Sequence, residues 1–260
     1  MRLALHLCDT QNWMRVFTLT LALLLFVPLQ SRQANTPALT GSESLQYAVE
    51  WRLVRAGTVR LEIKDSSSGR EARLQVRSTG IVSMLFPLDD LYVAQLGKDL
   101  CAVGSLLTAK EGTRLRETKV AYNSQRRKAT YLERDLIKNT EVLAREIDTP
   151  ACVHDIVGSL YFMRTLDLPV GRSMNVAVSD GKKSVMARVE AQKRETVTTP
   201  AGKFNAVRYE AFLFNNILFG RSGVLYFWLT DDDRRLPVQI QVRLQFYIGT
   251  ITLQLEKIES

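Results

Sequence analysis

Apolar and polar residues alternate one by one along much of this chain. From Leu45 to Leu53 every second residue is large and apolar, and the same pattern recurs over residues 59–64 and 73–77. A period of two is typical of a β-strand with one buried and one solvated face. Gly57 and the Ser66–Gly69 stretch separate the three segments, so we expect antiparallel strands that turn at these two places.

The alternation returns in the C-terminal half of the chain, over residues 184–190, 207–211, 238–246 and 251–256. Residues 224–229 (VLYFWL) differ because they are apolar on both faces. This pattern predicts a central strand, or a strand with a helix on one side and the core on the other.

One segment, Val153–Leu166, has its apolar residues at the spacing of a helix, and Pro169 with Gly171 ends it. Asp155 falls in its first turn, where a carboxylate favours the positive end of the helix dipole. A shorter turn is expected within Ile81–Leu91, where Pro87 interrupts a strand pattern.

These elements predict a mainly β fold. Roughly ten strands present far more apolar surface than one helix can cover. We therefore expect a single antiparallel, strongly curved sheet, as a barrel, a half-barrel or a folded-over sheet, with one main helix packed on or in it. Residues 45–260 form the predicted domain, and a small polar stretch at 35–44 reads as a linker.

The N-terminal residues 1–34 have the pattern of an export signal. A basic Arg15 precedes an uncharged apolar run, Val16–Leu29, which is shorter than a membrane-spanning helix requires. We expect a cleaved signal peptide, with an uncleaved anchor as the alternative. The protein would then be exported, and periplasmic if the source is Gram-negative.

Composition supports a folded globular protein. With 46% apolar and 24% charged residues the chain is unlike disordered or fibrous proteins. The formal charge of +8 is modest for 260 residues, and no nucleic-acid-binding motif is present, so we expect no nucleic-acid partner. Cys101 and Cys152 remain in the exported part, either as a disulfide or as two buried thiols.

The search for catalytic chemistry finds no signature. His154 is the only histidine after the signal segment, so a zinc site would need Cys101, Cys152 and His154 together, which we disfavour. His154 and Asp155 are better explained by the start of the helix than by a base and its orienting carboxylate. We predict no enzymatic activity, no cofactor and no metal.

A curved sheet of this size can retain an apolar cavity. Arg164 lies near the apolar stripe of the helix, where it would contact a headgroup or carboxylate at the mouth of a cavity. We favour instead a salt bridge to a carboxylate of the sheet, or a side chain that extends its charge to water. The candidate lining comes from the helix and two strands: Trp51, Leu160, Tyr161, Phe162, Met163, Arg164, Tyr226 and Trp228.

Surface candidates are a predicted hairpin tip and several basic clusters. The tip carries Phe214, Ile217, Leu218 and Phe219, which would insert into a membrane, bind a partner or fold back on the core. The basic clusters fall in predicted turns at residues 126–128, 182–183 and 234–235. Asp231 to Asp233 read as an ordinary polar turn rather than a metal loop.

Four ordered blocks carry a family resemblance: Glu43–Gly57, Asp155–Gly171, Glu195–Tyr209 and Trp228–Val238. Together they resemble the uncharacterised bacterial exported family catalogued as domain of unknown function 3108. The resemblance implies an exported bacterial protein and carries no activity or site residues. The expected architecture is also similar to that of the LolA and LolB type of periplasmic lipoprotein carriers.

Two functions follow. The first is an exported cell-envelope binding protein that shelters a lipid or another apolar molecule in its curved sheet. The alternative is a non-enzymatic envelope scaffold or protein-interaction domain with a fully packed core, whose loops bind another protein. Besides an apolar ligand, the expected partners are an envelope protein or a membrane surface.

Overall fold

The computed structural model describes residues 41–52, 54–212, 223–244 and 249–259. The predicted signal peptide and residues 35–40 of the predicted linker lie outside these ranges. The end of that linker is described and is wrong as a linker, because the first strand already begins at Glu43. Within the described ranges no helix is both long and apolar enough to cross a membrane.

The described strands form one 14-stranded antiparallel sheet. Their bounds are β1 (Glu43–Trp51), β2 (Val54–Ser66), β3 (Gly69–Ser78), β4 (Asp89–Leu96), β5 (Ala102–Glu111), β6 (Arg114–Asn123), β7 (Lys128–Asp135), β8 (Thr140–Asp148), β9 (Ser173–Ser179), β10 (Ser184–Thr199), β11 (Gly202–Ala211), β12 (Gly223–Thr230), β13 (Pro237–Leu244) and β14 (Gly249–Glu259). Within the described ranges two helices accompany them, α2 (Gly80–Leu85) and α3 (Ile156–Arg164).

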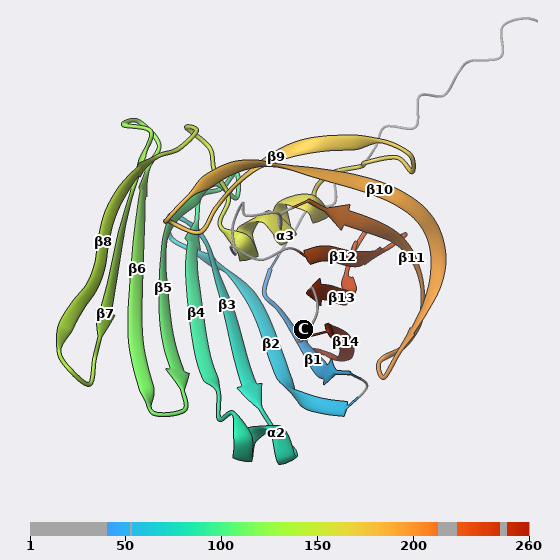
Figure 1. Ribbon diagram of the computed structural model, residues 1–260. Coiled ribbons are helices and arrows are strands. Elements are labelled where there is room, and N and C mark those ends of the chain that lie inside the picture. The colour runs from blue at the N-terminus through green and yellow to red at the C-terminus, as the bar shows by residue number, and fades with distance from the viewer. Residues whose placement is uncertain (1–40, 53, 213–222, 245–248, 260) are drawn as a thin grey trace, which may run out of the picture. The chain divides into compact units, whose positions relative to one another are not determined.

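The sheet consists of two meanders that meet at its centre. Its order is β8-β7-β6-β5-β4-β3-β2-β1-β14-β13-β12-β11-β10-β9, so β1 and β14 pair although they lie at opposite ends of the described chain. In this pairing Tyr47 faces Leu255. Figure 1 shows the sheet curling so that α3 lies on its concave side. The predicted mainly β fold with one curved antiparallel sheet is confirmed, and the described strands β8 and β9 leave the sheet unclosed.

The curvature has a local cause in several strand pairs. Register shifts interrupt β10 between Ala191 and Lys193, and β12 between Trp228 and Leu229. Such bulges bend a strand and increase its twist. The long β10 can therefore follow the curled edge of the sheet.

The structure corrects one local prediction in the first strands. Gly57 does not turn the chain but lies inside β2, beside the register shift that opposes Glu50 to Arg55. A Cβ atom at Gly57 would lie 2.2 Å from the carbonyl oxygen of Arg77, so this glycine lets two backbones approach closely. The sequence analysis also missed six strands, β4 to β9, most of which lack clear alternation.

Helix α3 begins later and ends earlier than the predicted Val153–Leu166. Asp155 is its N-cap rather than a first-turn residue: one carboxylate oxygen accepts hydrogen bonds from the amides of Val157 and Gly158, each at 2.9 Å. Gly158 faces β4, where a Cβ atom would lie 2.9 Å from the Leu96 side chain. The cap and the glycine together fix α3 against the sheet. The shorter turn predicted within Ile81–Leu91 corresponds to α2 and the start of β4.

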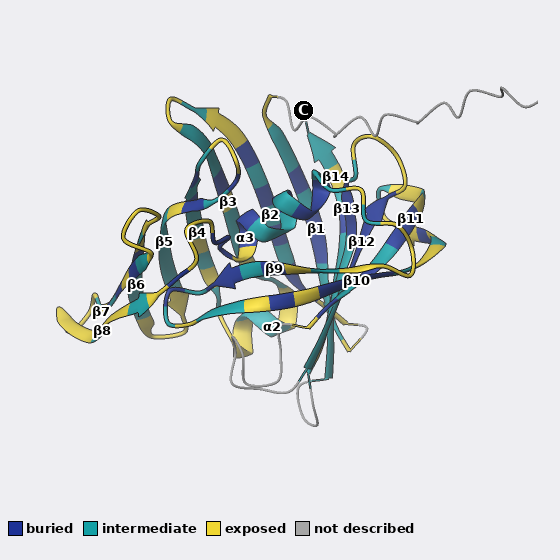
Figure 2. Ribbon diagram, turned by 90° about the horizontal axis from the view of Figure 1, so that it is seen from above, coloured by how far each residue is buried: buried dark blue, intermediate teal, exposed yellow. Residues whose placement is uncertain are grey.

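Buried side chains form one cluster on each side of α3. The larger cluster contains residues of β1 to β4 and of β10 to β14 together with Val157 and Tyr161 of the helix. The second joins the Met163 face to β9 through β13. Figure 2 shows buried residues on α3 and on the strands around it, whereas β8 is mostly exposed.

Candidate functional site

An apolar cavity of about 580 Å³ lies between α3 and the concave face of the sheet. The helix contributes one wall, β9 to β14 contribute most of the rest, and β3 contributes one residue. The lining residues are Leu74, Ile156, Ser159, Leu160, Met163, Val176, Val178, Ala187, Val189, Ala211, Leu225, Phe227, Ile240, Val242, Leu244 and Leu253. None of them carries a titratable side chain.

Strand alternation explains which side chains reach the cavity. In β12, Leu225 and Phe227 line it, and their partners across the ladder are Val242 and Ile240 of β13. Neighbouring residues of a strand point to opposite faces. Tyr226 and Trp228 therefore lie on the other face of β12, and neither lines the cavity.

The prediction that Tyr226 and Trp228 contact the ligand is therefore corrected. The Trp228 indole donates a hydrogen bond to Glu195 at 2.9 Å, and the guanidinium of Arg208 lies 5.2 Å from the centre of the Tyr226 ring. Trp51, at the end of β1, also lies outside the lining, and the guanidinium of Arg52 is 5.6 Å from the centre of its ring.

The residues of α3 that were predicted to bind the ligand lie in different surroundings. Leu160 and Met163 line the cavity as expected. Tyr161 points into the larger core cluster. Phe162 stacks on the ring of His154 with centroids 4.2 Å apart. Leu160 and Met163, three residues apart on the helix, therefore face the cavity. The two residues between them pack against other parts of the protein.

Arg164 does not face the cavity. Its Nη1 and Nη2 atoms donate to the two carboxylate oxygens of Glu43 at 2.6 and 3.0 Å, and Nη2 also donates to the Arg234 carbonyl at 3.1 Å. The arginine side chain is 2% exposed. The alternative favoured from the sequence, a salt bridge to a carboxylate of the sheet, is what the structure contains.

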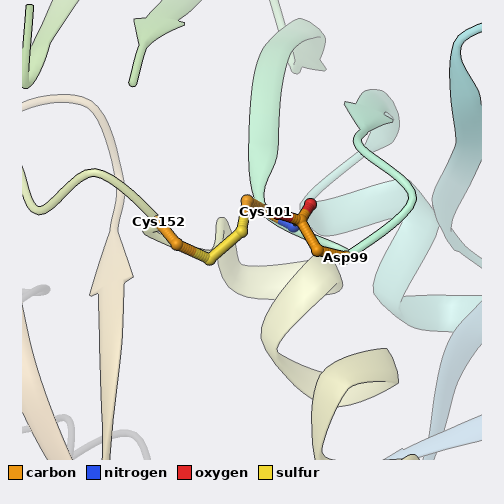
Figure 3. A group of neighbouring side chains, drawn as sticks. All are labelled: Asp99, Cys101 and Cys152. Atoms are coloured by element: carbon orange, nitrogen blue, oxygen red, sulfur yellow. A yellow bond between two sulfur atoms is a disulfide. The ribbon is translucent and has the colours of Figure 1, made fainter. Parts of the chain in front are cut away.

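A disulfide joins Cys101, just before β5, to Cys152, just before α3, with the two Cα atoms 5.2 Å apart. Asp99 lies beside it (Figure 3) and accepts a hydrogen bond from the Cys101 amide at 3.1 Å. These three residues have the proximity of a metal site, but both sulfurs are used by the disulfide. The remaining donor, a single exposed carboxylate, would hold an ion only weakly.

Two titratable groups at the start of α3 are buried. His154 pairs with the Leu100 carbonyl through Nδ1 at 2.8 Å, and burial lowers the pKa of its imidazole. Burial raises the pKa of the Asp155 carboxyl, while the helix amides and the Tyr92 hydroxyl oppose this rise. Asp155 therefore has the helix-start role favoured from the sequence, whereas His154 lies just before α3 in a bridge to Val178. Neither residue lines the cavity.

The remaining surface candidates have separate outcomes. The predicted tip residues Phe214, Ile217, Leu218 and Phe219 lie outside the described residues. Asp232 accepts hydrogen bonds from the amides of Arg234 and Arg235, so the aspartate run forms a polar turn between β12 and β13, as expected.

Sequence reasoning missed the cavity residues of β3 and of β9 to β14. The alternation over residues 184–190 predicts that Ala187 and Val189 lie on one face of a strand. It does not show which strands pack around the helix and so line the cavity. The lining residues limit the chemistry of the cavity. It can remove an apolar group from water, and it offers no acid, base or nucleophile among its lining residues.

Comparisons with known proteins agree with the fold. Residues 46–256 match the model of a family described as a protein of unknown function, DUF3108. A crystal structure of a β-barrel-like protein of domain of unknown function DUF1849 from Brucella abortus has a TM-score of 0.54 at 11% identity, covering 84% of this chain and 97% of that chain. No curated protein matches this sequence.

Two more solved structures have TM-scores of only 0.32, which supports no argument. One is a protein from Bacteroides fragilis described as exported and as having a YmcC-like fold, 9% identical over 85% of this chain and 97% of that chain. The other is a protein from Parabacteroides distasonis described as a lipoprotein, 10% identical over 85% of this chain and 96% of that chain.

Proposed function

Because the chain belongs to the DUF3108 family, whose function is unknown, we propose a function from its own cavity: this is an exported cell-envelope protein that binds an apolar ligand, such as an acyl chain, between α3 and the sheet. The observation that carries the proposal is the apolar cavity of about 580 Å³. That volume falls in the range of small-molecule sites.

The lining favours hydrocarbon over a polar ligand. Apart from Ser159, every lining residue is apolar, and the Ser159 hydroxyl already donates to the Ile156 carbonyl at 2.8 Å. Each buried methylene contributes about 0.8 kcal/mol, so even a short acyl chain gains several kcal/mol before ordering costs. We propose binding rather than catalysis, since no lining side chain titrates.

The partly exposed Ile156 supports a route into the cavity at the start of α3. A polar headgroup could remain in water there while the apolar chain is buried. Two features support export: the predicted signal at residues 1–34, and the disulfide, because such bonds persist in oxidising compartments.

A pair of variants in one strand tests ligand binding. Ala187→Phe places a ring in the cavity, whereas Met186→Phe changes the adjacent residue, which is 58% exposed and points to the opposite face. The readouts are titration of the mature protein with a fluorescent fatty acid, and native mass spectrometry to detect a co-purified lipid.

We expect binding by the wild type and by Met186→Phe, and loss of binding in Ala187→Phe. Circular dichroism must show that Ala187→Phe remains folded, because overpacking costs about 1 to 3 kcal/mol. Leu160→Met, which nearly conserves volume, should retain binding. A wild type that binds no apolar probe and carries no lipid would contradict the proposal and favour the scaffold alternative.

A further inference from the structure

Helix α2 exposes an unusual amount of apolar surface. Ile81, Met84 and Leu85 of the helix and Phe86 after it are between 64% and 76% exposed, and no residue of α2 is buried. Soluble proteins normally cover a contiguous group of large apolar side chains. We call these four residues the α2 patch.

The patch is held in place by backbone hydrogen bonds on both sides of the helix. The Thr79 amide donates to the Ala56 carbonyl at 2.9 Å, and the Ser78 amide donates to the Leu88 carbonyl at 3.0 Å. The Gly112 amide of the β5–β6 turn donates to the Pro87 carbonyl at 2.7 Å. Neighbouring hairpins thus fasten the base of α2, while its apolar side chains remain in solvent.

A small polar pocket of about 250 Å³ lies directly beside α2. It is lined by Arg77, Ser78, Ser83, Pro87, Leu88, Asp89, Lys110 and Gly112. The lining carries two cations and one carboxylate: Arg77 pairs with Asp89 at 3.0 Å, and Lys110 is the second cation. The Asp90 carboxylate, just outside the lining, accepts a hydrogen bond from the Lys110 amide at 2.9 Å. A cationic, hydroxyl-bearing pocket suits a phosphate group.

Other apolar residues are exposed at the same end of the sheet. Antiparallel pairing places the start of β2, the end of β3 and the turn after β7 together at this end. Val54 at the start of β2 and Ile137 in the β7–β8 turn are both exposed. Two turns at the opposite end, residues 66–69 and 123–127, contain only polar residues and glycine, and Leu100 in a third turn there, residues 97–101, is buried.

We propose that this end of the sheet docks on the surface of a phospholipid bilayer. The α2 patch enters the outer acyl region, and the pocket of Arg77 and Lys110 holds a headgroup phosphate. The juxtaposition of exposed hydrocarbon with a phosphate-sized cationic pocket matches the two parts of a phospholipid. A protein partner is less well matched, because the neighbouring pocket is polar and the apolar residues project from separate hairpins.

The proposal is separate from ligand binding in the cavity. The α2 patch and its pocket share no residue with the cavity lining. The cavity variant Ala187→Phe should therefore dock on vesicles as the wild type does, whether or not the cavity binds an apolar ligand.

Vesicle flotation with the mature protein tests the docking. The vesicles contain phosphatidylcholine with phosphatidylglycerol, or phosphatidylcholine alone. The test variant is Met84→Ser with Phe86→Ser. The matched control is Val103→Ser with Met186→Ser, two residues that are similarly exposed, at 55% and 58%, away from α2. Lys110→Gln examines the pocket.

We expect the patch variant to lose at least about tenfold in vesicle affinity, and the control to bind like the wild type. Lys110→Gln should weaken binding about threefold on both kinds of vesicle, because phosphatidylcholine and phosphatidylglycerol both carry the phosphate that the pocket holds. In Phe86→Trp, the indole emission should shift to the blue when vesicles are added. Equal flotation of patch and control variants, or an unshifted Phe86→Trp emission, would overturn the proposal. A large fall in melting temperature of the patch variant would also overturn it, because the patch would then be packed inside the protein.

Discussion

Arg164 and Glu43 form a two-point ion pair across 121 residues of sequence, at 2.6 and 3.0 Å. The pair links the last residue of α3 to the first residue of β1. Since the Arg164 side chain is almost fully buried, its charge depends on this partner.

Glu43→Gln should destabilise the protein strongly. Removal of one member of a buried pair leaves an uncompensated charge, which lowers the free energy of unfolding. We expect a loss of about 3 kcal/mol, at the lower end of the usual range, because Glu43 is partly exposed. Calorimetry should show the melting temperature falling by roughly 6 to 12 °C. The control is Glu62→Gln, whose pair with Arg60 is exposed and should contribute about 1 kcal/mol or less. Equal melting temperatures for the two variants would show that the buried pair stabilises the protein no more than the exposed pair does.

Loss of the disulfide should also lower stability. The bond joins residues 51 apart, and the chain-entropy model assigns about 4 kcal/mol to such a closure. We expect Cys101→Ser with Cys152→Ser to unfold at a clearly lower urea concentration than the oxidised wild type. Wild-type protein treated with reductant should match the variant. An unchanged midpoint under both treatments would contradict this role.

Stability should fall as the pH falls below about 6.5, because of His154. Burial lowers the pKa of its folded imidazole below the ordinary value of 6.5, so the unfolded chain binds more protons in this range. The stability that neutral His154 contributes is therefore complete above pH 6.5 and is lost as the pH falls toward the pKa of the folded protein. In urea titrations between pH 5 and 7.5, His154→Gln should have a weaker pH dependence than the wild type. Parallel curves would contradict the assignment.

Gly57→Ala should cost about 1 to 3 kcal/mol, as overpacking does. The added methyl would lie 2.2 Å from the Arg77 carbonyl oxygen, so β2 and β3 would have to separate. Thr58→Ala, at the next position of the same strand, adds no atom and serves as the control. If urea unfolding gave both variants the same midpoint, the close approach of the two strands would not exist in solution.

The sequence predicted the fold class because alternation and one helical segment are local patterns. It identified β1, β13 and β14, where apolar residues occupy nearly every second position. It missed β8, because this edge strand is largely exposed and has no buried residue to reveal a face. Gly57 was misinterpreted for a similar reason: only the position of β3 shows that a glycine is needed inside a strand.

The candidate site was predicted only in part. Leu160 and Met163 followed from the helix spacing, but Trp228 and Tyr226 did not line the cavity. A strand that is apolar on both faces does not reveal which face meets the helix. Phe227, which does line the cavity, belongs to the same run of residues. The face of β12 is set by its pairing with β11 and β13, and such long-range pairing is absent from local patterns.

The central position of β1 has a consequence for the order of folding. Strands β1 to β8 pair with sequence neighbours, so that meander can assemble while the chain is being synthesised. Until β14 emerges, the inner edge of β1 has free backbone groups in the middle of the future sheet. This edge is a site at which a partly made chain could pair with another chain. When β14, the last described strand, pairs with β1, it closes this edge.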